Sequence, residues 1–303
     1  MRTIEAPQAT ASPPEVGPGR SVMRYRVRRI SYKVCVYLFL IVLCSFILLP
    51  VAWMLTAALK PDLEPVFTPT PEWFPTKFFQ WDNFRRVLTE SMPFLRYMLN
   101  TMIIVVGNIL GVLLSCSVVG FAFARLLFRG SKVLFYILIV TMLIPWQALM
   151  VPQFLFFVKL GWYGSYYPLI VPSFTGSAFF IFLIRQYMRT IPRDLDDAAR
   201  VDGLNTWQIF WRIILPLSTP VLTVCAVFTF LGSWNNLLGP LIYLDSDEKF
   251  TVAIGLANLV TRADTPWNLT MAANLVTILP TVIVYFFVQK KLIGGIASVG
   301  LKG

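Results

Sequence analysis

Residues 194–222 read DLDDAARVDGLNTWQIFWRIILPLSTPVL, a charged segment followed by an apolar one. Three aspartates come at its start, and Gly203 follows where a short helix would end. Acidic side chains stabilise the positive N-terminal end of a helix, and glycine takes the left-handed conformation that often ends one. The pattern predicts a helix over residues 193–202, a turn at Gly203 and a second helix capped by Asn205 or Thr206.

The two helices of this hairpin have different faces. Helical spacing places four residues of the first helix on one side, with small alanines where a partner could come close: Leu195, Ala198, Ala199 and Asp202. The second helix has an apolar stripe made of Ile209, Phe210, Ile213 and Ile214. The hairpin either lies on lipid headgroups or docks to a protein. An anionic cytoplasmic leaflet would repel the three aspartates, which favours docking.

Long apolar runs flank the hairpin. The 303 residues are 57% hydrophobic and 14% charged, whereas soluble domains carry about 25% charged residues. Six runs free of Asp, Glu, Lys and Arg are long enough to cross a bilayer: Val34–Leu59, Tyr97–Ala124, Val133–Val158, Gly161–Ile184, Ile213–Leu244 and Thr265–Gln289. The sequence therefore predicts an all-α membrane protein with six transmembrane helices.

Most of the 26 Lys and Arg residues lie on the side of the membrane that carries the two termini. The positive-inside rule makes this side cytoplasmic. The net charge of +11 is thus an orientation signal, and nucleic acid is not expected as a partner. The predicted order is a disordered basic cytoplasmic tail (1–33), a first transmembrane helix (34–59), an external loop (60–96), a core domain of five transmembrane helices (97–289) with a cytoplasmic loop at 190–215, and a cytoplasmic tail (290–303).

Three shorter segments carry expectations of their own. GNILG, residues 107–111, has the spacing of small residues that lets membrane helices approach closely. WDNFRRVLTESM, residues 81–92, predicts a short surface helix. Phe250–Thr261 is too short to span and is placed outside the membrane or as a re-entrant segment. The sequence Asn-Leu-Thr at Asn268 is interpreted as a chance match to a glycosylation site.

Residue types needed for enzyme chemistry are sparse. The sequence has no His, and its four Cys lie in the apolar runs, so no metal site, disulfide or catalytic role is expected. The nearest approach to a phosphate-binding loop, from Gly295 to Gly300, has Leu301 where the lysine should stand. The spans also lack the ionisable residues on which ion coupling depends. Energy for transport would have to come from another subunit.

The hairpin resembles the cytoplasmic loop motif of binding-protein-dependent ABC transporter permeases, which reads Glu-Ala-Ala, three residues, Gly, then Ile-x-Leu-Pro. Asp197 stands where the family usually has Glu. The segments NTMIIVVGN, GFAFARLLFRGSK, LIPWQALMVPQFLFF, SWNNLLGPLIYL and QKKLIGGIASVGLKG are similar to the carbohydrate-uptake branch, and specifically to its maltose-permease G-type subunit.

The resemblance implies a type I ABC importer permease fold in the cell membrane. It implies a sugar or oligosaccharide importer with an F-type partner permease, two ATP-binding subunits that hold ATP and Mg, and an extracytoplasmic sugar-binding protein. Contact with the ATPase is implied for Asp197, Ala198, Ala199, Asp202, Gly203, Ile213, Leu215 and Pro216, and for the tail residues Gly300, Lys302 and Gly303. The alternatives are a subunit of an ion-gradient-driven secondary transporter and an ABC permease for another solute such as a glycerol phosphate.

Sugar recognition inside a membrane needs aromatic faces and amide or hydroxyl groups. The candidates for a substrate pathway are Asn108, Gln147, Gln153, Trp234, Asn235, Asn236 and Asn274. Each of them would serve equally well to hold neighbouring helices together.

Overall fold

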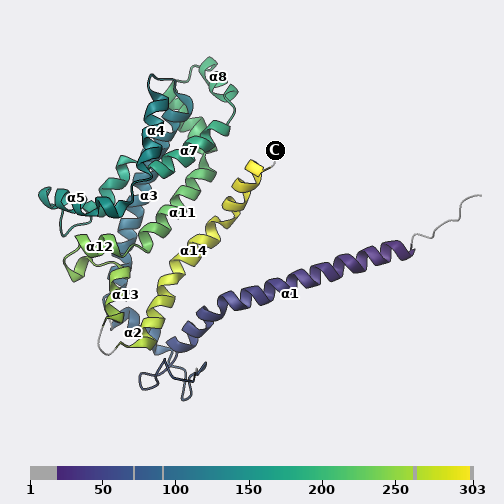
Figure 1. Ribbon diagram of the computed structural model, residues 1–303, viewed down its shortest axis with the longest axis vertical. Coiled ribbons are helices and arrows are strands. Elements are labelled where there is room, and N and C mark those ends of the chain that lie inside the picture. The colour runs from purple at the N-terminus through teal and green to yellow at the C-terminus, as the bar shows by residue number, and fades with distance from the viewer. Residues whose placement is uncertain (1–18, 71, 91, 262–264, 301–303) are drawn as a thin grey trace, which may run out of the picture. The chain divides into compact units, whose positions relative to one another are not determined.

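The computed structural model describes residues 19–70, 72–90, 92–261 and 265–300, and all regular structure within these ranges is helical. The chain divides into two compact units, residues 1–53 and 54–303. Figure 1 labels the longer helices of both units.

The first unit contains most of helix α1 (Gly19–Ala58). The stretch Arg28–Ala58 contains an 18-residue window with a mean hydropathy of 2.9 and is long enough to cross a bilayer, in agreement with the first predicted span. The helix already begins at Gly19, inside the segment 1–33 that the sequence assigns to a tail. Residues 1–18 of that segment lie outside the described residues.

The second unit is a bundle of helices and short helical turns. In chain order these are α2 (Asp82–Thr89), α3 (Phe94–Arg125), α4 (Ser131–Thr141), α5 (Trp146–Lys159), α6 (Tyr167–Ile170), the 3₁₀ turn η1 (Val171–Thr175), α7 (Ala178–Thr190), α8 (Asp194–Val201), α9 (Thr206–Ile209), the π-helical turn η2 (Phe210–Ile214), α10 (Leu215–Leu217), α11 (Thr219–Trp234), α12 (Leu238–Tyr243), the 3₁₀ turn η3 (Asp247–Lys249), α13 (Val252–Val260) and α14 (Trp267–Gly300). Helix α2 lies within the segment predicted as a short surface helix. Helix α13 occupies the short stretch 250–261, whose place outside the membrane stays a prediction.

Helix α3 is the central element of this unit and runs from the α2 end to the α8 end (Figure 1). Two apolar clusters form along it. The cluster at the α2 end includes Phe94, Tyr97 and Trp234, and the cluster at the α8 end includes Phe121 and Phe210. Helices α7 and α11 pack along α3. The hairpin lies between α7 and α11 in the chain, so both of its ends are attached to helices that contact α3.

Close contact along α3 depends on glycine, as the GNILG spacing predicts. A Cβ atom at Gly107 would lie 2.7 Å from the Ile170 side chain, and one at Gly111 would lie 2.0 Å from Ser173 Oγ. Real Cβ atoms do not come this close to other heavy atoms. Side chains of the α6–η1 segment therefore pack directly against the backbone of α3, without room for a larger residue at Gly111.

Among the described residues, four helices are long and apolar enough to cross a membrane, and up to six if each of two bent pairs counts as one span. The four are Arg28–Ala58, Phe94–Arg125, Tyr167–Thr190 and Trp267–Gln289. Two of the predicted spans are bent pairs of helices. The run Val133–Val158 bends by 95° between α4 and α5, and Ile213–Leu244 is interrupted by a 73° bend that precedes α11.

Proline accounts for both bends. Pro145 takes an extended conformation at the start of α5, and proline disfavours helical geometry in the residue before it. Pro216 and Pro220 stand on either side of Ser218, where α10 ends and α11 begins. Because proline cannot donate a backbone hydrogen bond, the helical ladder is interrupted there. An apolar run in the sequence therefore did not guarantee one continuous helix.

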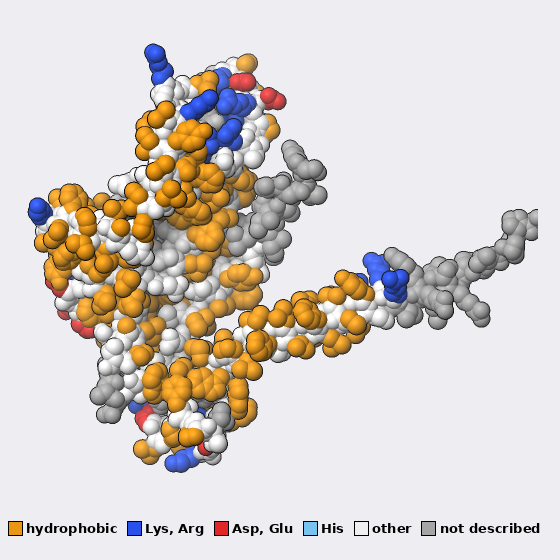
Figure 2. Space-filling model, viewed as in Figure 1, with side chains coloured by type: hydrophobic (Ala, Val, Ile, Leu, Met, Phe, Trp, Pro, Cys, Tyr) orange, Lys and Arg blue, Asp and Glu red, His pale blue; other side chains and the backbone are white. Residues whose placement is uncertain are grey.

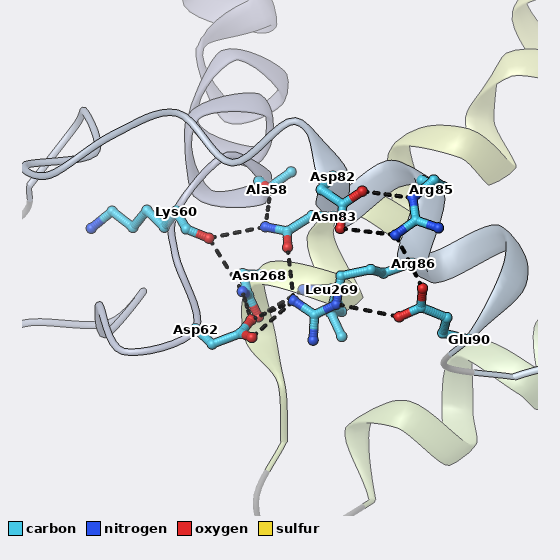
Figure 3. Close-up of polar contacts among 10 residues, drawn as sticks. All are labelled: Ala58, Lys60, Asp62, Asp82, Asn83, Arg85, Arg86, Glu90, Asn268 and Leu269. Atoms are coloured by element: carbon cyan, nitrogen blue, oxygen red, sulfur yellow. Dashed lines mark hydrogen bonds and ion pairs between the residues drawn. The ribbon is translucent and has the colours of Figure 1, made fainter.

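Side-chain amides hold the α2 end of the unit together (Figure 3). Asn83 Nδ2 donates to the carbonyl oxygens of Ala58 and Lys60, both at 2.9 Å. Asn268 Nδ2 donates to the Lys60 carbonyl at 3.2 Å and to Asp62 Oδ1 at 2.7 Å. Asn268 is 5% exposed, which agrees with the interpretation of its Asn-Leu-Thr sequence as a chance match.

An ion pair completes this network. Arg86 Nη1 lies 2.8 Å from Asp62 Oδ2 (Figure 3). The hydrogen bond from Arg86 lowers the pKa of the Asp62 carboxyl, against the smaller opposing effect of burial, and the bond from Asn268 adds to the lowering. The loop after α1, the surface helix α2 and the start of α14 are thus bound to one another by directed polar contacts.

Candidate functional site

The predicted hairpin is present at the α8 end of the second unit. Helix α8 ends at Val201, and Gly203 follows with a φ of +84°. Asn205, not Thr206, caps α9: its side chain accepts from Gln208 N at 2.9 Å, while its own backbone N–H donates to Gln208 Oε1 at 2.9 Å. This reciprocal pair of hydrogen bonds fixes the direction in which α9 leaves the turn at Gly203.

The second part of the hairpin, formed by α9 and η2, packs into the apolar cluster at the α8 end. Ile209, Phe210 and Ile214 are at most 2% exposed, and Ile213 packs against the same cluster. The Phe210 ring lies 5.0 Å from that of Phe121 on α3. The apolar stripe predicted from the sequence is therefore confirmed. The π-helical geometry of η2 was not predicted, and such turns are frequent at functional sites.

A buried ion pair attaches α8, the first helix of the hairpin, to α3. Asp196 Oδ2 on α8 lies 3.4 Å from Arg125 Nη1 at the end of α3, and the two side chains are 8% and 3% exposed. Arg125 Nη2 also donates to the carbonyl of Ile191 at 2.9 Å. The sequence places Asp196 only among the acidic residues of a first turn, because nothing in a single sequence selects one of three aspartates as the partner of a distant arginine.

The outer face of α8 is exposed. Val201 is 89% exposed and Leu195 is 41% exposed, and Ala198, Asp202 and Gly203 are exposed as well. Asp197 is also on the surface, where its side chain is 70% exposed and lies 3.1 Å from Arg200. This surface combines apolar, small and acidic side chains.

Ala199 corrects one detail of the predicted face. It is only 4% exposed and packs into the apolar cluster, whereas Ala198 faces outward. The two alanines therefore lie on different faces of α8, because about 100° of rotation separates adjacent residues of a helix. Ala199 brings α8 close to the bundle, and Ala198 leaves its outer surface flat.

The remaining residues of the motif occupy the turn and the chain that follows it. Gly203 is exposed, and within the described part of the chain a Cβ atom there would meet nothing within 4 Å, so its positive φ is the reason for glycine. Ile213 and Leu215 are half-buried and Pro216 is exposed. Of the tail residues, Gly300 ends α14, and Lys302 and Gly303 lie outside the described residues.

Four of the polar candidates for a substrate pathway donate hydrogen bonds, two of them to a neighbouring helix and two within their own helix. Asn108 Nδ2 donates to Ser233 Oγ at 3.0 Å, and Trp234 Nε1 donates to the Thr277 carbonyl at 3.2 Å. Each of these two bonds joins neighbouring helices. Asn235 and Asn274 donate to carbonyl oxygens one turn earlier in the chain, at 2.9 and 2.8 Å.

Two candidates line a common cavity of about 430 Å³ between α5, the α6–η1 segment, α11 and α12. These are Gln153 and Asn236, and the lining also includes the aromatic residues Trp146, Phe157 and Tyr243. Asn236 Oδ1 accepts from Gly239 N at 3.1 Å, which fixes the direction of its amide. Gln147 is exposed and is not part of the described lining of this cavity.

Residues 107–297, which include the hairpin and this cavity, match the family described as binding-protein-dependent transport system inner membrane component. The chain belongs to this family. It is a permease component of an ABC transporter and a multi-pass protein of the cell membrane. The hairpin described above is therefore part of a transport protein.

Similar binding-protein-dependent permeases include the arabinooligosaccharides transport system permease protein AraQ of Halalkalibacterium halodurans. It is 34% identical over 254 residues, which are 84% of this chain and 91% of that protein. AraQ of Bacillus subtilis is 30% identical over 282 residues, which are 93% of this chain and all of the relative.

The fold has a counterpart of known structure. A chain from the crystal structure of a bacterial ABC transporter involved in the import of the acidic polysaccharide alginate superposes with a TM-score of 0.73 at 24% identity. The superposition covers 88% of this permease and 97% of the other chain. The permease therefore has the helical fold of an ABC importer permease.

Proposed function

We propose that this permease is one of the two membrane chains of an ATP-driven importer for a sugar or oligosaccharide. It would be the counterpart of the maltose-permease G-type subunit and would work beside an F-type partner. The proposal is supported by relatives that are named for arabinooligosaccharide transport and align over most of their length with this chain.

In this proposal each bent pair of helices forms one span, which gives six spans with both termini in the cytoplasm. Residues 60–96 then lie outside the cell, where a sugar-binding protein would dock. Residues 190–215 lie in the cytoplasm, where two ATP-binding subunits hold ATP and Mg. The permease itself binds no nucleotide, since its sequence lacks a phosphate-binding loop.

The hairpin is the observation that carries the proposal. Its outer face, with Ala198 and Val201, is open for a partner, while Asp196 and Phe210 fix its inner side to α3. A force that an ATP-binding subunit applies to α8 would therefore reach the centre of the bundle through the ion pair and the aromatic contact. Nucleotide-driven closure would in this way shift the balance between two arrangements of the helices.

The cavity that contains Gln153 and Asn236 is the proposed sugar contact of this chain. Its aromatic walls offer flat apolar faces and its two amides offer donors and acceptors, which is the combination that a sugar needs. The bonded Asn108 and Trp234 are assigned to helix packing instead. For Gln147 the pathway role stays a prediction.

Site-directed cross-linking tests the docking role. Val201→Cys and Leu63→Cys replace apolar residues that are 89% and 88% exposed at the two ends of the second unit. Each is made in a chain whose exposed Cys35 and Cys44 are replaced by Ala. A thiol-anchored photocrosslinker at residue 201 should capture the ATP-binding subunit in membranes, and the same reagent at residue 63 should not.

Two results would contradict the proposal. Capture of the ATP-binding subunit from residue 63 but not from residue 201 would reverse the assigned orientation. Sugar uptake into vesicles that contain this chain alone, driven by an ion gradient, would replace the ABC mechanism with secondary transport.

A further inference from the structure

A second cavity, of about 700 Å³, lies at the α8 end of the core, between the loop that joins α3 to α4 and the C-terminal part of α7. Its charged lining is entirely basic among the described residues: Arg129, Lys132, Arg185, Arg189 and Arg193. Figure 2 shows Lys and Arg side chains gathered at this end of the unit. We call this site the basic cavity.

The charges of the basic cavity are not neutralised within the described chain. None of its five basic side chains forms an ion pair there, and Asp196 and Asp197 of the adjacent α8 are paired with Arg125 and Arg200. Like charges held in one cavity repel one another, so a bound anion relieves this repulsion. Helix α4 begins at Ser131 in the wall of the cavity and adds the positive end of its dipole.

One guanidinium in the cavity is fixed in place. Arg185 Nε donates to the Phe123 carbonyl at 3.3 Å, and its guanidinium carbon lies 3.8 Å from the centre of the Phe135 ring. Arg189 follows one turn later on α7 and lines the same cavity. Basic residues that only set membrane orientation need neither a cavity nor a fixed guanidinium. The geometry therefore fits the capture of an anionic group.

Apolar side chains beside the basic cavity indicate what the anion is attached to. Leu127 is 92% exposed, Val133 is 62% exposed and Phe128 is 40% exposed, and all three belong to the lining. A soluble phosphate would leave these side chains uncovered. A phospholipid would place its headgroup among the arginines and its hydrocarbon chains along the loop and α4.

We infer that the basic cavity binds the headgroup phosphate of an anionic phospholipid, such as phosphatidylglycerol. Arg185 and Arg189 hold the phosphate from α7, and Arg129 and Lys132 hold it from the loop and the first turn of α4. A lipid bound there contacts both the third and the fourth predicted spans close to the hairpin. This inference goes beyond the proposed transport function and can fail independently of it, because lipid binding needs neither sugar nor ATP.

Lipid titration of the purified full chain tests the inference. The chain in a neutral detergent is titrated with dioleoylphosphatidylglycerol, with dioleoylphosphatidylcholine and with inorganic phosphate, and bound lipid is counted by native mass spectrometry. The test variant is Lys132→Gln/Arg189→Gln, with one change in each wall of the cavity. The matched control is Lys159→Gln/Arg212→Gln, two exposed basic residues that are not part of the described lining.

Phosphatidylglycerol should bind the original chain and the control alike. Its affinity should fall about fivefold for each basic residue removed, hence about twenty-five-fold for the Lys132→Gln/Arg189→Gln chain. The swap Lys132→Arg/Arg189→Lys keeps both charges and should restore most of the affinity, which shows that loss of binding in the test variant is not loss of folding.

Three results would overturn the inference. Equal losses in the test variant and the control would mean that the cavity is not the site. Inorganic phosphate that binds as tightly as phosphatidylglycerol would make the ligand a soluble anion. Loss of phosphatidylglycerol from the complete importer, but not from the free chain, would assign the basic cavity to a protein partner.

Discussion

Replacing Arg125 by methionine should release helix α8 from the bundle. The substitution keeps an unbranched apolar stem but removes the cation and its bond to Ile191. It leaves the Asp196 carboxylate, which is 8% exposed, without a partner of opposite charge. Removing one partner of a buried ion pair costs about 3–5 kcal/mol. Since each ~1.4 kcal/mol is a factor of ten, the equilibrium between docked and released α8 should shift by roughly a hundredfold to several thousandfold.

Thiol labelling measures this shift directly. Ala199 is 4% exposed, so a cysteine introduced there should react with a water-soluble maleimide only when α8 leaves the bundle. Arg125→Met should therefore speed labelling of Ala199→Cys by about two orders of magnitude or more, up to the rate of a free thiol. Ala198→Cys, on the exposed side of the same helix, is the matched control and should react equally fast with and without Arg125.

A double replacement separates charge pairing from simple packing. Arg125→Met/Asp196→Leu removes both charges, and replacing a whole buried ion pair by apolar residues is often neutral or stabilising. Labelling of Ala199→Cys in this chain should return toward the original slow rate. If Arg125→Met changes the rate by less than threefold, or if the double replacement is no slower than the single one, the ion pair does not hold α8.

Three further predictions concern other parts of the second unit. Gly111→Ala places a Cβ atom 2.0 Å from a side-chain oxygen of η1 and should lower the free energy of unfolding by about 1–3 kcal/mol. Gly232→Ala is the control, because a Cβ atom there meets no described atom within 4 Å, and it should not lower the free energy of unfolding. Thermal unfolding compares the two variants. Asp197→Lys should weaken co-purification with the ATP-binding subunit and Asp197→Glu should preserve it; equal recovery would mean that the charge is irrelevant. The folded-state pKa of Asp62 is lowered, so its contribution to stability is complete above its ordinary pKa of 3.8 and is lost as the pH falls through the lowered value. Asp62→Asn should therefore flatten the acid side of the stability profile, and an unchanged profile would exclude this linkage.

Local sequence rules predicted the hairpin well. The three aspartates, Gly203 and Asn205 act within a few residues of one another, so helix dipole, left-handed turn and cap can be read from spacing alone. The exposed stripe of α8 follows from the same periodicity, apart from Ala199. The GNILG glycines were also informative, because close contact between membrane helices leaves a short-range signature.

Contacts between distant residues could not be predicted in the same way. The partner of Arg125 is one of three aspartates that are equivalent in sequence, and the choice is made by how α7 orients α8. The prolines at 145, 216 and 220 mark interruptions of the apolar runs in the sequence. The size of the bends at Pro145 and Ser218 could not be predicted, because hydropathy does not record where the backbone hydrogen bonds of a helix stop. Sorting the pathway candidates likewise required the packed bundle, in which Trp234 and Asn108 are bonded and Gln153 and Asn236 face a cavity.

The glycine residues along α3 limit how this permease can move. Added Cβ atoms at Gly107, Gly111 and Gly120 would collide with Ile170, Ser173 and Ile184, so α3 fits α6, η1 and α7 without clearance. Surfaces this tightly interlocked cannot slide past each other by a fraction of a helical turn without atoms overlapping. These elements therefore travel as a single rocking block. The hinges for alternating access would then lie elsewhere, at the proline breaks that precede α5 and α11.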